Sequence, residues 1–148
     1  MFENEINIYH HIGQSMFNVL PDKWDRAYFI FKMLEVDNAA LSEQFYMKGN
    51  DFFGFDVDED EYSETFEAFD CLFKMMQTND LDTPWNKARF ELKPDGSFDM
   101  KFKYDEDFAW LVAVDHYSDA YERLSANDMN LIKSWDGVPE VYDRYWLK

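Results

Sequence analysis

Residues 86–104 alternate between apolar and polar side chains on both sides of one turn, and this pattern constrains the fold more than any other segment. The apolar positions are Ala88, Phe90 and Leu92 before the turn, and Phe98, Met100, Phe102 and Tyr104 after it. Within the turn, Pro94 presets its backbone φ angle and Gly96 accepts a positive one. The segment therefore predicts an antiparallel β-hairpin. We expect Lys residues to lie opposite Glu91 and Asp99 and to form cross-strand ion pairs with them.

Helical and extended patterns alternate along the rest of the chain. Apolar residues at three- and four-residue steps predict helices over residues 3–20 and 61–77. The apolar stripe of the first helix consists of Ile6, Tyr9, Ile12, Met16 and Leu20. Strands are predicted over 27–36, 41–48 and 53–57, with a turn at Asn50-Asp51 between the last two. A final helix is predicted over 126–135, with Ser125 as its N-cap.

This order of elements, α-β-β-β-α-β-β-α, predicts the fold class. We expect an α+β protein, an antiparallel sheet of about five or six strands with helices packed on one face. The 148 residues fit one domain, so a single domain over 1–148 is predicted. Periodicity does not decide between a strand and a helix for Phe108–Val114, and the structure of residues 106–148 stays open.

Acidic residues outnumber basic ones by 31 to 14, which gives a formal net charge of −17. Solubility of a small domain needs a net charge of only about 2–8, and repulsion among surplus carboxylates opposes folding. A positively charged partner explains the surplus, and so does adaptation to high salt. Nucleic acid and anionic membranes attract clustered Lys and Arg, so this charge argues against both as direct partners.

The sequence contains no recognisable catalytic constellation. It has neither a Gly-rich phosphate loop nor a nucleophile-elbow motif. Cys71 is the single cysteine, and its apolar helical surroundings are typical of a core position. The adjacent His10 and His11 and the isolated His116 do not have the spacing of a zinc site. We therefore predict a protein that is not an enzyme, with no catalytic residue, no cofactor and no metal. A small enzyme that uses paired carboxylates in a cleft is kept as an alternative, because acids are abundant along the whole chain.

The cellular compartment is predicted from the cysteine count and the N-terminal sequence. A single cysteine allows no disulfide within the chain, which suits a reducing compartment. The N-terminal residues show neither a basic start nor a long apolar run, so no signal peptide is expected. We therefore predict a cytoplasmic protein.

One acidic segment also suggests a calcium loop. Its carboxylates fall at positions one, three, five, nine and twelve of the calcium-loop template, as Asp56, Asp58, Asp60, Glu64 and Glu67. The template requires Gly at position six, where this chain has Glu61. A calcium-binding acidic module is therefore kept as an alternative function.

The preferred interpretation of the same segment is a protein interface. Acidic residues recur between Asp51 and Asp70 without a Lys or Arg, and aromatic residues are interleaved with them. Charge of one sign speeds and orients binding, while aromatic anchors supply binding energy. The predicted partner-binding residues are Asp51, Asp56, Asp58, Glu59, Asp60, Glu61, Tyr62 and Glu64, with Tyr62 as the anchor. A second acidic stretch, Asp105–Asp107, is the alternative surface.

Two sequence segments resemble a known family. They are LPDKWDRAYFIFKML (20–34) and PWNKARFELKPDGSFDMKFKYDEDF (84–108). Together with the N-terminal helix, they resemble the YezG-like immunity proteins of bacterial polymorphic toxin systems over approximately residues 5–108. The resemblance implies a cytoplasmic antitoxin that binds and neutralises a cognate toxin domain, often a nuclease. A nucleic-acid-mimicking inhibitor of a host enzyme would also bind a basic partner through an acidic surface, and it is kept as an alternative.

Overall fold

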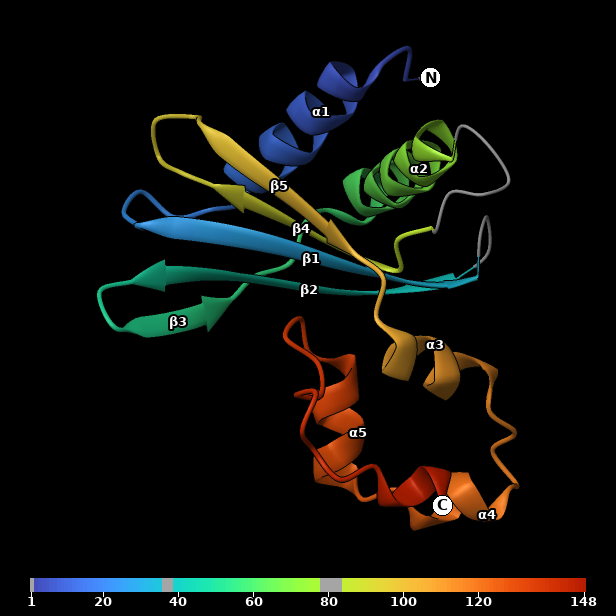
Figure 1. Ribbon diagram of the computed structural model, residues 1–148. Coiled ribbons are helices and arrows are strands. Elements are labelled where there is room, and N and C mark those ends of the chain that lie inside the picture. The colour runs from blue at the N-terminus through green and yellow to red at the C-terminus, as the bar shows by residue number, and fades with distance from the viewer. Residues whose placement is uncertain (1, 36–38, 78–83) are drawn as a thin grey trace. The chain divides into compact units, whose positions relative to one another are not determined.

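The computed structural model describes residues 2–35, 39–77 and 84–148 (Figure 1). The chain forms two compact units, which meet in sequence between Lys103 and Tyr104. A five-stranded antiparallel sheet with helices confirms the predicted α+β class. The assignment of residues 1–148 to a single domain stays a prediction. None of the described helices combines the length and the apolar character needed to cross a membrane.

The first unit is a sheet covered on one side by two helices. The strands are β1 (Arg26–Glu35), β2 (Ala39–Lys48), β3 (Asp51–Gly54), β4 (Lys87–Leu92) and β5 (Phe98–Lys103). Their order across the sheet is β3-β2-β1-β4-β5, and every neighbouring pair is antiparallel. The helices α1 (Glu5–Phe17) and α2 (Glu59–Met76) lie on the same side of the sheet (Figure 1).

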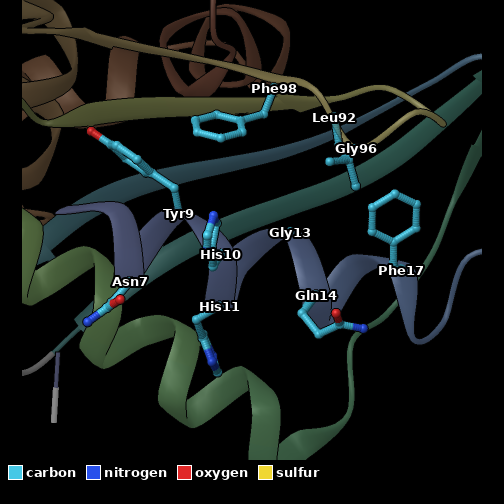
Figure 2. A pocket seen from close by; sticks show the side chains of 10 residues that line it. All are labelled: Asn7, Tyr9, His10, His11, Gly13, Gln14, Phe17, Leu92, Gly96 and Phe98. Atoms are coloured by element: carbon cyan, nitrogen blue, oxygen red, sulfur yellow. The ribbon is translucent and has the colours of Figure 1, made fainter. Parts of the chain in front are cut away.

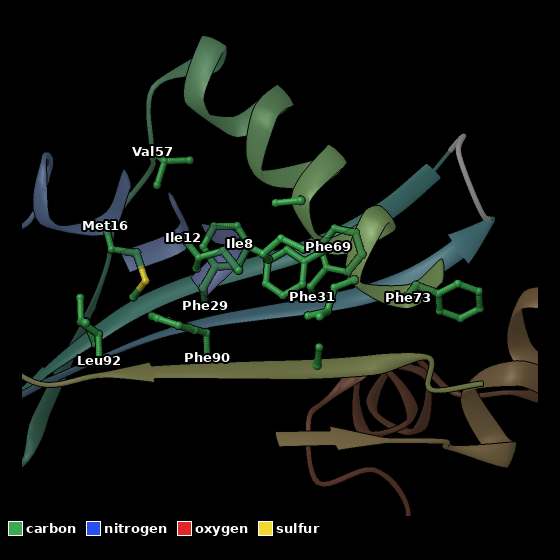
Figure 3. Close-up of a cluster of buried hydrophobic side chains, with 14 of the residues drawn as sticks. Ile8, Ile12, Met16, Phe29, Phe31, Val57, Phe69, Phe73, Phe90 and Leu92 are labelled. Carbon is green, nitrogen blue, oxygen red and sulfur yellow. The ribbon is translucent and has the colours of Figure 1, made fainter. Parts of the chain in front are cut away.

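The core of this unit fills the space between the sheet and the two helices. Strand register places Phe29 opposite Phe90, and the Phe31 ring stacks on Phe69 of α2 with ring centroids 4.4 Å apart (Figure 3). From α1, the buried apolar residues are Ile8, Ile12 and Met16. Ile6 was predicted to lie on this stripe but is 62% exposed. The buried stripe therefore repeats every four residues from Ile8.

The β2–β3 hairpin turns one residue earlier than predicted. Gly49 has a φ of 64°, which suits a two-residue turn formed by Gly49 and Asn50. Pairing accordingly begins with Lys48 opposite Asp51. The predicted turn at Asn50-Asp51 and the predicted bounds 53–57 of this strand are therefore wrong. The strand ends at Gly54.

The β4–β5 hairpin is confirmed, but its predicted cross-strand ion pairs are wrong. The Lys93 N–H donates to the Ser97 carbonyl at 2.9 Å, and the register that follows places Glu91 opposite Asp99. Arg89 likewise lies opposite Lys101, so like charges face each other across the hairpin. The Glu91 carboxylate instead lies 4.0 Å from the guanidinium of Arg26 on β1.

The second unit is helical. It consists of α3 (Glu106–Ala113), α4 (Asp119–Arg123), α5 (Ala126–Lys133) and a short 3-10 helix, η1 (Tyr145–Leu147). Its buried apolar residues are Phe108, Leu111, Leu124, Ile132 and Trp146. The structure thus resolves Phe108–Val114 as mostly helix. Ser125 is confirmed as the N-cap of α5, because its hydroxyl accepts from the Asp128 N–H at 3.1 Å.

A candidate protein-binding surface

Helix α2 carries a row of carboxylates on its solvent-facing side. Asp60, Glu64 and Glu67 follow one another at four- and three-residue steps, so they share one side of the helix. All three are exposed, whereas Thr65 and Phe69 on the other side are buried. The row ends at Lys74, whose ammonium pairs with Asp70 at 3.1 Å. Helix formation thus gathers carboxylates that are spread along the sequence.

The predicted acidic residues ahead of α2 are exposed as well. Asp51 opens β3, and Asp56 and Asp58 lie between β3 and the helix. We call the exposed carboxylates of Asp51, Asp56, Asp58, Asp60, Glu64 and Glu67 the acidic surface. Asp51 stands apart from the other five, because it opens β3 at the end of that strand farther from α2 (Figure 1). The side chains of Glu59 and Glu61, which were also predicted to bind a partner, lie outside the described part of the structure.

The position of Asp58 links this surface to the start of α2. Asp58 is the N-cap residue, but its side chain makes no capping hydrogen bond. Carboxylates at a helix N-terminus still interact favourably with the positive end of the helix dipole. Further along, the Glu64 carboxylate lies 3.8 Å from His11 Nδ1 of α1, and His11 Nε2 lies 3.3 Å from the Thr65 hydroxyl.

Tyr62, the predicted anchor, is partly enclosed by the fold. It is half-buried and packs against the core, and its hydroxyl accepts a hydrogen bond from Ser42 Oγ at 3.2 Å. Its role as an anchor stays a prediction. The more exposed aromatic residues beside the acidic surface are Phe52 and Phe53 of β3, which are 71% and 45% exposed. Two consecutive Phe residues signal the exposure of one of them, because neighbours in a strand point to opposite faces and helices cover only one face of this sheet. Phe52 is the residue on the uncovered face, and Phe53 keeps part of its exposure because β3 is an edge strand.

The alternative acidic stretch has a different environment. Asp105 is the N-cap of α3, and its carboxylate accepts from the Phe108 N–H at 3.0 Å. Asp107 accepts two hydrogen bonds from the Arg144 guanidinium, at 2.8 and 3.0 Å. This interaction with Asp107 raises the pKa of Arg144. Of the three acidic residues in this stretch, only Glu106 is exposed.

The calcium-loop alternative conflicts with the backbone of α2. The template needs a loop that turns sharply at position six, but the chain is helical from Glu59 onward. Asp60, Glu64 and Glu67 therefore lie along a helix, where they do not surround one point. Among the described residues, no group of three or more His, Cys, Asp or Glu is arranged to hold a metal ion.

A hollow of about 590 Å³ lies between α1 and the β4–β5 hairpin. Its lining includes Tyr9, His10, Gln14 and Phe98 (Figure 2). Burial, followed by the nearby Glu5 charge, raises the pKa of Tyr9. No Cys, Ser or carboxylate side chain is among the lining residues, so the hollow does not present a paired nucleophile and base.

Comparison with known families gives a match over most of the chain. Residues 6–126 match the family described as "Immunity protein YezG-like". Comparison with curated proteins gave no match. The family match includes the whole sheet, α2, α3 and α4, so it extends beyond residue 108, where the resemblance found in the sequence ended. The chain therefore belongs to the YezG-like family of immunity proteins.

Proposed function

We propose that this protein is an antitoxin that binds a cognate bacterial toxin domain and neutralises it through the acidic surface. Membership of an immunity-protein family is the observation that carries the proposal. Immunity by binding requires a complementary surface and no reaction. This agrees with a chain whose sequence shows no catalytic motif.

A nuclease is the toxin class that best fits the charge of this protein. Nucleases bind phosphate groups through clustered Lys and Arg, and a net charge of −17 attracts such a cluster over a long range. The exposed carboxylates of α2 and of the segment before it form a local source of this field. Binding there blocks the nucleic acid, either by occupying the phosphate sites or by covering them. Because a nuclease toxin damages nucleic acid inside the cell, we place the antitoxin in the cytoplasm.

The test uses the toxin domain encoded by the neighbouring gene. We expect co-expression with this chain to restore growth of cells producing the toxin, and the purified proteins to form a tight complex without nuclease activity. Association should slow steeply as salt is added, because salt screens the attraction. An unrelated nuclease of similar positive charge is the matched control, and it should bind far more weakly. Absence of both complex formation and growth rescue would refute the antitoxin function.

A further inference from the structure

Strand β3 ends the sheet, and its outer edge faces no other described strand. The Phe55 N–H donates to the Gln44 carbonyl at 3.2 Å, so the backbone N–H of Phe55 points toward β2. Residues alternate in an antiparallel ladder, and the register pairs Tyr46 with Phe53. The N–H and C=O groups of Phe52 and Gly54 therefore point away from β2. This edge presents the backbone groups that an added strand requires.

Apolar side chains flank this edge on both faces of the sheet. Phe53 stacks on Tyr46 with ring centroids 5.3 Å apart, on the side of the sheet that carries the helices. Phe52 contacts Phe45 edge-on at 6.1 Å on the opposite side. Both phenylalanines keep a large exposed fraction. A strand paired with β3 would cover part of each ring, which adds apolar burial to the backbone hydrogen bonds.

Charge determines which kind of strand fits here. Asp51 lies at one end of β3, and Asp56 and Asp58 follow the other end. If a second copy of the chain paired antiparallel with this edge, Asp51 of each copy would approach Asp56 of the other. Like charges at such positions are destabilising. A strand with Lys or Arg at its ends is attracted to the same edge.

We infer that the edge of β3 binds an extended segment of the toxin, which adds a strand to the sheet and places basic side chains beside Asp51 and Asp56. This inference rests on the proposed antitoxin function and names the part of the surface that the toxin contacts. The backbone of Phe52 and Gly54 supplies the hydrogen bonds, while the two Phe rings supply the apolar contact. The carboxylates at both ends fix the register of the added strand.

Amide hydrogen exchange, measured by NMR on the full chain with and without the neighbouring gene's toxin domain, tests the hydrogen bonds directly. In the free chain, the amides of Phe52 and Gly54 should exchange rapidly, whereas those of Phe53 and Phe55 are protected by β2. In the complex, exchange at Phe52 and Gly54 should slow at least tenfold. Phe53 and Phe55 serve as the internal control, since their amides point toward β2 in both states.

Substitutions test the same edge by affinity. Gly54→Pro removes an outward N–H, and edge strands tolerate proline. An added Cβ at Gly54 would lie 3.8 Å from the Gln44 carbonyl oxygen, an ordinary contact. We expect toxin affinity to fall at least tenfold while the melting temperature is unchanged, and Phe52→Ala to act in the same direction. Phe98→Ala, on the opposite edge strand β5, is the matched control and should leave affinity unchanged.

The possible outcomes separate this inference from the function on which it rests. If the wild-type chain does not bind the toxin domain, both fail. If it binds, but Phe52 and Gly54 stay unprotected and Gly54→Pro binds normally, the strand inference fails and the antitoxin function stands. A free chain that is a dimer, and that Gly54→Pro converts to monomers, would make a second copy the occupant and would also overturn the inference. Should Gly54→Pro fail to fold, the exchange measurement on the wild-type chain decides.

Discussion

Asp105 and Asp107, at the start of α3, have hydrogen-bond partners within the second unit, whereas Asp56, Asp58 and Asp60, at the start of α2, are exposed to solvent. Both segments combine carboxylates with aromatic residues and precede or open a helix. In the second unit, the carboxylates cap a helix and neutralise an arginine. In the first unit, the N-cap residue Asp58 makes no capping bond.

Hydrogen-bond partners distinguish structural acids from acids that serve binding in a strongly acidic protein. A carboxylate that satisfies a backbone N–H or a guanidinium contributes to stability, and its loss leaves that donor unpaired. An exposed carboxylate on one side of a helix contributes little to stability, but its field extends to an approaching partner. In the second unit, the Asp128 carboxylate likewise accepts from the hydroxyls of Tyr142 and Tyr145. We therefore expect substitutions in the first unit's acidic surface to change binding, and those at Asp105, Asp107 and Asp128 to change folding.

Toxin binding should respond most strongly to substitutions in the acidic surface. Reversing three charges together, Asp56→Lys, Glu64→Lys and Glu67→Lys, should weaken the complex about 1000-fold, on the order of 4 kcal/mol, if these charges are desolvated at the interface. These positions lie outside the first turn of α2, so the reversal does not oppose the helix dipole. Isothermal titration calorimetry with the toxin domain measures the change.

The control for this experiment makes the same charge change in the second unit. Glu122→Lys, Asp136→Lys and Glu140→Lys reverse three exposed acids there. Toxin affinity should fall far less than with the first triple variant, because only the overall attraction changes. Equal losses from both triple variants would mean that net charge alone, and no local surface, determines binding.

The next effect concerns the stability of the second unit. Arg144 donates to both Asp107 oxygens and to the carbonyls of Glu140 and Tyr142. Arg144→Met should lower the free energy of unfolding by about 2 kcal/mol, because a partly buried carboxylate loses its charged partner. Urea unfolding measures this change.

A second ion pair in the same unit provides the control for Arg144. Lys148 Nζ lies 2.9 Å from Asp143, but the two side chains are 75% and 69% exposed. Water screens such a pair, so Lys148→Met should hardly change stability. If Arg144→Met and Lys148→Met lowered the free energy of unfolding equally, enclosed and exposed carboxylates would not differ in their contribution to stability.

A smaller effect compares the two N-cap residues. Asp105→Ala removes the acceptor of the Phe108 N–H and should cost about 1 kcal/mol of stability. Asp58→Ala removes no capping bond, so thermal unfolding should show a clearly smaller loss, while toxin binding weakens. The opposite order of the two losses would show that Asp58 is a structural acid.

Local patterns were sufficient to predict most of the first unit. Alternation of apolar residues located β4 and β5, and three- and four-residue steps located α1 and α2, because each of these elements buries one side. The family resemblance was visible in the same segments and is confirmed by the match over residues 6–126. The strand register was less predictable. Hydrogen bonding at the turn determines the register and places Glu91 opposite Asp99, although charge attraction would favour a Lys opposite each of them.

The candidate site was predictable in its charge but not in its surroundings. The sequence showed that acids gather between Asp51 and Asp70, yet it did not show which carboxylates are exposed. Asp107 and Arg144 are 37 residues apart, so no local pattern reveals that they interact. Likewise, the apolar run around Leu111 fits both a strand and a helix, and the cap at Asp105 distinguishes them once it is recognised.

Asp128 in the second unit should give the stability of the protein a modest dependence on pH. Its carboxylate accepts from the hydroxyls of Tyr142, at 2.5 Å, and Tyr145, at 2.7 Å. These hydrogen bonds lower the pKa of Asp128 below its ordinary value, and the bond from Tyr142 has the larger effect. The folded protein therefore binds a proton at this site less readily than the unfolded chain does. The ionised Asp128 carboxylate therefore stabilises the folded protein above about pH 4, and this stabilisation is lost as the pH falls through the lowered pKa.

Thermal unfolding between pH 7 and pH 3 measures this contribution. Asp128→Asn cannot titrate at this position, so its melting temperature should be lower than that of the wild type at pH 7 and should fall less as the pH decreases. Asp136→Asn, which changes an exposed carboxyl in the same unit, should keep the wild-type melting temperature at pH 7. If Asp128→Asn also kept it, the acids of the second unit would resemble the exposed acids of α2, and the distinction between structural and binding carboxylates would rest on Asp105 and Asp107 alone.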